Sequence, residues 1–261
     1  MFPVAPRRAV FAVVAVFAAL LFAGSATMTA LRFMSMTAMS GTPMPGGWSL
    51  SAAWLPLCGG TWLRTAMSFV SMWASMMPAM MLPALAPVLW RERRTLANCS
   101  GWLIIFNAIG YFMVWLLAGI AIFPLGAAIA SLDMRVPSIA HAAPIAAGLV
   151  VMAAGVLQCT SWKAGRLQSC HSILQCHDAA SAVRIGIRLA LHCASCCGNW
   201  MAVLLATGVM DREGTLIVSA AIAIERVAAS RGALVRLVGV ASMAAGGLLI
   251  VHAILKFARS H

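Results

Sequence analysis

The sequence predicts an all-α integral membrane protein, a polytopic bundle of about seven transmembrane helices. Composition is the first reason: 62% of the 261 residues are hydrophobic and only 9% are charged, whereas soluble domains carry about 25% charged residues. Length is the second reason, because the apolar runs approach the roughly 20 residues needed to cross the hydrocarbon core of a bilayer. These runs are rich in Ala, Leu and Met and lack the alternating pattern of outer-membrane strands.

Seven apolar runs within a single membrane domain are expected to form the crossings: residues 9–31, 62–90, 101–125, 141–160, 189–210, 215–229 and 237–256. The first run follows Arg7 and Arg8 and is longer than the apolar core of a signal peptide, so we expect a membrane anchor. The run at 215–229 is short and contains Glu225. A bundle of six crossings, in which this run does not span, is therefore the alternative.

Polar or turn-forming residues separate these runs in order along the chain. Residues 32–61 are rich in Met, Pro, Gly and Ser, which predicts a Met-rich outer loop. The second run holds three prolines, which are expected to kink it, and it ends at the charged residues 91–94. A short polar connection at 133–137 precedes the fourth run, and a basic inner loop containing Cys and His, 161–188, precedes the fifth. The turn at 211–214 precedes the sixth.

The net charge of +12 reflects basic residues at the ends of the apolar runs. Placing the N-terminus in the cytoplasm puts twelve of the 18 basic residues in inner segments, which is the distribution that the positive-inside rule favours. We therefore expect a multi-pass protein of the bacterial inner membrane with a cytoplasmic N-terminus. The same charges suit anionic lipid headgroups, so no nucleic-acid partner is expected.

The first group of candidate metal ligands is the run His192, Cys193, Cys196 and Cys197. On a helix, positions 193, 196 and 197 follow the i, i+3, i+4 spacing, so the three thiols share one face, and His192 lies one turn before Cys196. Soft thiolates with an imidazole suit Cu(I), Zn(II) or an iron–sulfur centre. The alternative is that these cysteines pack as small apolar residues.

The second group lies in the expected inner loop, where Cys170 and His171 are followed by Cys176 and His177. These two pairs supply four soft or borderline ligands in one segment, although their spacing is not that of a zinc finger. The alternative is a polar loop whose thiols are incidental.

The third group is formed by methionines, eleven of which fall between Met28 and Met81. Met72, Met76 and Met80 follow the i, i+4, i+8 spacing on the second helix, and Met77 and Met81 repeat it one position later. A thioether stripe can bind Cu(I) without losing a proton, but methionine also fills irregular gaps between helices. Four more methionines fall in the expected outer loop: Met34, Met36, Met39 and Met44.

Several of these segments together resemble a bacterial family described as predicted metal-binding integral membrane proteins. The resemblance covers about residues 62–255 and is carried by the Met- and Pro-rich segment 72–87, by Gly110-Tyr111 and Trp115, by the basic segment 163–170, and by the Cys-x-x-Cys-Cys run that starts at Cys193. The resemblance implies a helical membrane fold and metal binding.

Taken together, these patterns favour a protein that handles a soft metal, with Cu(I) binding, transport or delivery expected first and zinc as a second metal. The expected partners are the lipid bilayer, other membrane subunits or a copper protein. One alternative is a non-catalytic structural or assembly subunit of a larger membrane complex, since small residues on helix faces suit close packing. We do not expect an enzyme, because no paired carboxylates or Ser/His/Asp set is present; thiol redox chemistry at the Cys-x-x-Cys-Cys run is the third alternative.

Overall fold

The computed structural model describes residues 7–37, 42–44, 48–50, 53–56, 60–91, 101–168, 178–208, 211–227 and 232–260. Within these ranges the chain forms eight helices and one small hairpin: α1 (Arg7–Thr37), β1 (Thr42–Met44), β2 (Trp48–Leu50), α2 (Trp62–Arg91), α4 (Gly101–Arg135), α5 (Pro137–Gln158), α6 (Ser161–Gln168), α7 (Ala179–Thr207), α8 (Arg212–Val227) and α9 (Gly232–Ser260). The predicted all-α class is confirmed.

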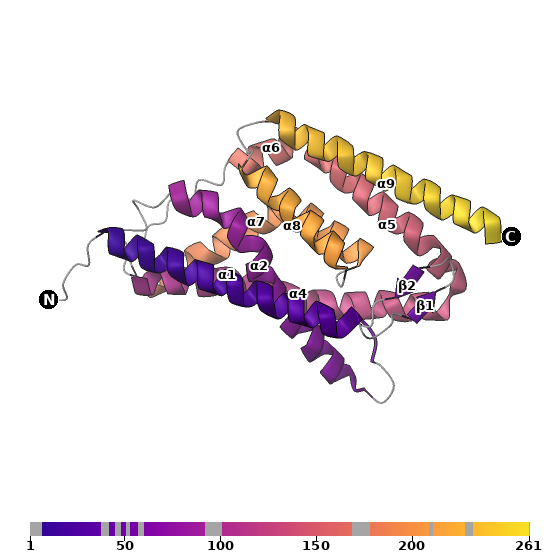
Figure 1. The fold of residues 1–261 in the computed structure, drawn as a ribbon, viewed down its shortest axis with the longest axis horizontal. Coiled ribbons are helices and arrows are strands. Elements are labelled where there is room, and N and C mark those ends of the chain that lie inside the picture. Colours follow the sequence, from indigo (N-terminus) through magenta and orange to yellow (C-terminus); the bar gives the residue numbers. More distant parts are fainter. Residues whose placement is uncertain are drawn as a thin grey trace.

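All of the helices except the short α6 run through the bundle, each opposite in direction to the one before it (Figure 1). Six helices in the described ranges are long and apolar enough to cross a membrane: α1, α2, α4, α5, α7 and α9. The remaining helix, α8, has 16 residues, which gives a length of about 24 Å. It packs against α2 and α7, and Leu216, Ile217 and Ile224 lie exposed on its surface.

Two helices differ from the predicted apolar runs by ten residues at one end. α7 begins at Ala179 rather than at residue 189, because Asp178 caps its first turn: the carboxylate accepts from the Ser181 backbone N–H at 3.3 Å, and the Ser181 hydroxyl completes a capping box. α4 continues to Arg135 instead of ending near residue 125. The expected basic loop at 161–188 is therefore shortened at both ends by α6 and α7.

The structure describes part of the segment expected as a Met-rich outer loop. α1 extends to Thr37, and β1 pairs with β2 in antiparallel register, with Met44 opposite Trp48. The Trp48 indole donates to the Ala140 carbonyl at 2.9 Å, which holds the hairpin against α5. Met44 is buried and Met34 is exposed. The side chains of Met36 and Met39 lie outside the described residues.

Glycines allow α5 and α9 to pack with their backbones close together (Figure 1). A Cβ atom added at Gly155 would lie 2.6 Å from the Gly239 carbonyl oxygen, and one added at Gly246 would lie 2.7 Å from the Met152 backbone nitrogen. Small residues at helix interfaces in membranes permit such approaches and increase van der Waals contact. The antiparallel pair α5–α9 is therefore built on glycine contacts.

Glycines also allow close packing between α4 and α7, the helix that carries the cysteines. A Cβ atom at Gly110 would lie 2.4 Å from the Val183 carbonyl oxygen, and one at Gly186 would lie 2.1 Å from the Asn107 carbonyl oxygen. The Asn107 side chain adds a hydrogen bond to the Ala182 carbonyl oxygen at 3.3 Å. This close approach places Tyr111 of α4 beside the cysteine-bearing face of α7.

A matched pair of substitutions in α9 tests the glycine packing. Gly246→Ala should lower the melting temperature in detergent, because its methyl group would meet the backbone of α5, and overpacking costs about 1–3 kcal/mol. Gly247→Ala should leave the melting temperature unchanged or raise it, since a Cβ atom there meets nothing within 4 Å and alanine favours helix. The measurement is thermal unfolding followed by circular dichroism. Equal melting temperatures for the two variants would contradict the packing described here.

Candidate metal site

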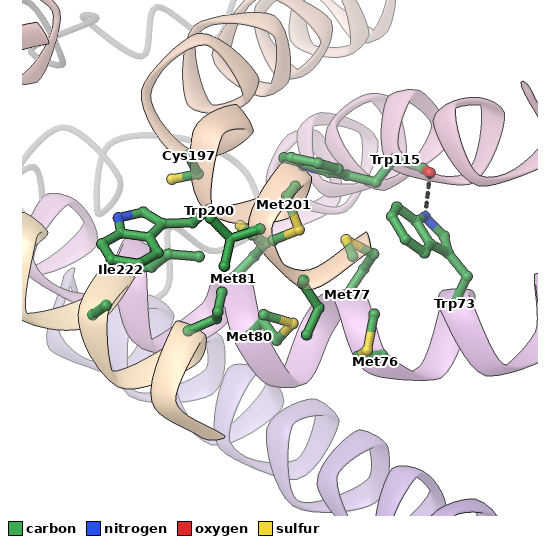
Figure 2. Packing of buried hydrophobic residues seen from close by; sticks show 14 of the residues in the cluster. Trp73, Met76, Met77, Met80, Met81, Trp115, Cys197, Trp200, Met201 and Ile222 are labelled. Atoms are coloured by element: carbon green, nitrogen blue, oxygen red, sulfur yellow. Dashed lines mark hydrogen bonds between the residues drawn. The ribbon is translucent and has the colours of Figure 1, made fainter. Parts of the chain in front are cut away.

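Five methionines of α2 form a stripe turned into the bundle: Met72, Met76, Met77, Met80 and Met81, none of which exposes more than 1% of its surface. The rotation of α2 is set in part by Trp73, whose indole N–H donates to the Trp115 carbonyl oxygen on α4 at 2.8 Å (Figure 2). Figure 2 also shows Met80 and Met81 in one layer with Met201 and Trp200 of α7. The thioethers of α2 therefore lie inside the protein.

One cysteine of α7, Cys193, meets this methionine layer at Met81, and a second, Cys197, lies beside Cys193. The Sγ atoms of Cys193 and Cys197, one helical turn apart, are separated by 3.9 Å, and Cys193 Sγ lies 3.8 Å from the Met81 Sδ atom. We call these three residues the sulfur cluster. Cys193 and Cys197 are free thiols with 1% and 2% exposure. Two helices far apart in the sequence thus bring two thiols and a thioether together away from water.

Polar groups from two further helices reach the thiols. The Tyr111 hydroxyl of α4 donates to Cys193 Sγ at 3.2 Å. From α8, the Arg226 guanidinium approaches Cys193 Sγ at 3.1 Å and Cys197 Sγ at 3.7 Å through the same nitrogen, Nη2. A positive charge at this distance stabilises a thiolate, the form of cysteine that binds metals. The Arg226 guanidinium therefore places a positive charge directly beside both thiols of the sulfur cluster.

A buried ion pair lies next to this environment. Glu225 of α8 accepts from the Lys163 ammonium group of α6, with Nζ to Oε2 at 3.1 Å, and both side chains are almost fully buried. Its other carboxylate oxygen, Oε1, accepts from the Trp200 indole and the Gln158 amide. Lys163 also donates to Asn199 Oδ1 at 2.9 Å. Lys163 was expected in the basic inner loop. Its side chain is instead buried and bonds to groups of α7 and α8.

The structure brings together some of the predicted ligands and separates others. Cys193 and Cys197 meet as their spacing predicted, Cys196 is fully buried, and His192 is half-buried. Met72, Met76 and Met80 lie in the core, but the methionine at Cys193 is Met81. The predicted ligands of the inner loop lie outside the described residues: Cys170, His171, Cys176 and His177.

Sequence reasoning missed two residues at the cluster, Tyr111 and Arg226. Tyr111 is the only tyrosine of the chain and Arg226 follows Glu225 in an otherwise apolar run. Ionisable and polar residues inside membrane helices are costly and mark functional sites. That signal was available from the sequence, but the partner of each residue was not.

The donors of the sulfur cluster distinguish between metals. Across the described residues, no group of three or more His, Cys, Asp and Glu side chains is placed to hold a metal ion. Zinc takes its ligands from those residue types, four in structural sites and three in catalytic sites, so the described residues do not offer it a complete set. Copper(I) also accepts thioethers, which makes Met81 a third donor. The two thiols and the thioether of the cluster are therefore donors of the soft kind that Cu(I) accepts.

Comparison with known proteins identifies the family to which the chain belongs. No curated protein and no solved structure matches the chain. Residues 70–249 match the model of the PpoB2 family, which is described as a copper chaperone. The matched segment extends from α2 into α9 and contains the whole sulfur cluster together with Tyr111 and Arg226. Because the match covers well over half of the chain, it confirms the expectation of a metal-related membrane family, and the chain belongs to the PpoB2 family of copper chaperones.

Proposed function

We propose that this protein binds one Cu(I) ion at Cys193, Cys197 and Met81 and delivers it to a copper protein. The observation that carries the proposal is the convergence of the three sulfur atoms, with Cys193 Sγ 3.9 Å from Cys197 Sγ and 3.8 Å from Met81 Sδ. Thiolate and thioether sulfur are the soft ligands that select Cu(I). Membership of a copper chaperone family supports the same metal.

The sulfur–sulfur distances support a shared ion. Metal–sulfur bonds of about 2.3 Å in a trigonal arrangement would separate the sulfur atoms by about 4 Å. The two measured separations, 3.9 and 3.8 Å, are close to that value. They are much longer than the roughly 2.05 Å of a disulfide.

Copper would reach or leave the cluster by exchange between sulfur ligands. The thioethers of Met72, Met76 and Met80 are buried like that of Met81, along successive turns of α2, and a neutral thioether binds Cu(I) more weakly than a thiolate does. A line of weak ligands that ends at two thiolates allows the ion to move without being released into water. In this proposal the methionine stripe is the route and the cysteine pair is the holding site.

The proposal places the protein in the bacterial inner membrane with its N-terminus in the cytoplasm. The distribution of basic residues supports this orientation, and six long apolar helices support a multi-pass protein. Cys170, His171, Cys176 and His177 would then lie on the cytoplasmic side and stay predicted ligands for transfer to or from a partner.

Copper content tests the holding site directly. Wild-type protein purified under reducing conditions and loaded with Cu(I) should retain about one copper per chain, the capacity of one site with two thiolates and a thioether. The Cys193→Ser/Cys196→Ser/Cys197→Ser variant should retain none above background, whereas Cys159→Ser, at an exposed free thiol, should match wild type. Elemental analysis beside protein quantification makes the measurement. Wild-type protein without copper would refute the proposal.

Thioether coordination has its own test. Met81→Leu keeps a similar side-chain volume, a change that cores tolerate well, but removes the sulfur atom. The dissociation constant for Cu(I), measured by competition with a chromogenic chelator, should rise about tenfold, equivalent to about 1.4 kcal/mol. Met72→Leu, at an equally buried position nine residues away on α2, should bind as wild type. Equal affinities in the two variants would remove Met81 from the site.

A further inference from the structure

The cation beside the sulfur cluster is buried with it. Arg226 exposes 8% of its surface, and its Nη2 atom lies 3.1 Å from Cys193 Sγ and 3.7 Å from Cys197 Sγ. Arginine stays protonated inside proteins. Any ion that enters the cluster therefore binds within a few ångströms of a permanent positive charge.

The neighbouring carboxylate is engaged elsewhere. Glu225 and Arg226 are consecutive on α8, and consecutive helical side chains point about 100° apart. Glu225 instead bonds to α5, α6 and α7: Lys163 pairs with it at 3.1 Å, and the Gln158 amide and the Trp200 indole donate to it. The charges of Lys163 and Glu225 offset each other. Arg226 thus presents its charge to the sulfur atoms next to a pair that is neutral as a whole.

This arrangement has a consequence for the charge of the bound ion. Two thiolates, a thioether and a monovalent cation carry a net charge of −1, which Arg226 neutralises. The same ligands with a divalent cation are neutral and gain no such attraction from Arg226, and Coulomb interactions are strong in a buried site. We propose that Arg226 makes the sulfur cluster select monovalent over divalent soft cations, an inference that rests on the proposed binding of Cu(I) at this cluster.

The selection does not depend on the protonation of the free thiols. The metal-free protein is the common starting state for both ions, so its charge cancels when their affinities are compared. What remains is the difference between a complex of charge −1 and one of charge 0, each beside the same guanidinium. The ratio of the two dissociation constants therefore reports the contribution of Arg226.

Competition titrations of the full chain in detergent test the proposal with three soft ions: Cu(I), Ag(I) and Cd(II). In Arg226→Gln the preference for Cu(I) over Cd(II) should fall on the order of a hundredfold, the effect of one charge about 5 Å away at an effective dielectric constant near 20. The ratio of the Ag(I) affinity to the Cu(I) affinity should stay within about threefold of its wild-type value. Both ions carry one positive charge, so the loss of Arg226 affects their complexes equally.

Two controls separate charge from packing. Arg226→Lys keeps the charge but loses the planar guanidinium, so its Cu(I)-to-Cd(II) preference should stay close to wild type. Arg188→Gln removes an exposed positive charge from α7 and should also leave the preference unchanged. If Arg226→Gln does not yield folded protein, Arg226→Leu replaces it, because leucine is also uncharged and offers no sulfur ligand.

The outcomes distinguish this inference from the proposed function. If wild type binds Cu(I) and the uncharged variant keeps the wild-type preference, Arg226 does not select charge, although the copper site stands. If Arg226→Lys loses the preference as fully as the uncharged variant, the guanidinium acts through its shape and the inference is overturned. If wild type binds neither Cu(I) nor Ag(I), both the proposed copper site and the proposed selection by Arg226 are refuted.

Discussion

The buried carboxylate of Glu225 sets the arrangement on which the interior depends. An isolated carboxylate inside a bundle would cost several kcal/mol, so it must be surrounded by donors. Lys163, Trp200 and Gln158 supply them from α6, α7 and α5. These bonds fix the depth and rotation of α8, a helix too short to be placed by its apolar length alone. The next residue along α8, Arg226, is thereby directed at the thiols of α7.

Close backbone packing supplies the rest of the geometry. Gly110 and Gly186 let α4 and α7 approach until a Cβ atom would collide with the opposite backbone, and Tyr111 then reaches Cys193. Trp73 fixes the rotation of α2 against α4 through its bond to the Trp115 carbonyl oxygen. Because both contacts constrain helices that border the sulfur cluster, the thiols and the thioether are held in place by groups that bind no metal themselves.

A chaperone for copper has to hold the ion firmly and still give it up. In the proposed site, two thiolates would hold the ion firmly, and a neutral thioether would be a ligand that can be replaced. Burial keeps water and oxygen-donor ligands away from a soft ion, while the nearby guanidinium offsets the negative charge that two thiolates and Cu(I) would create. The chemistry of the cluster and the family to which the chain belongs therefore point to the same cargo.

By itself the sequence determined the features that depend on one helix or one run of residues. The membrane class followed from composition, and the shared face of Cys193 and Cys197 and the stripe of methionines followed from helical spacing. The start of α7 is encoded locally as well, by the capping box of Asp178 and Ser181, although the apolar run predicted a start at residue 189. Only the tertiary structure decided that Met81 meets Cys193, that Lys163 is buried, and that Arg226 reaches the thiols. The physical reason is that these contacts depend on the rotation and depth of whole helices; Met81 and Cys193 are 112 residues apart, and no local pattern encodes their register.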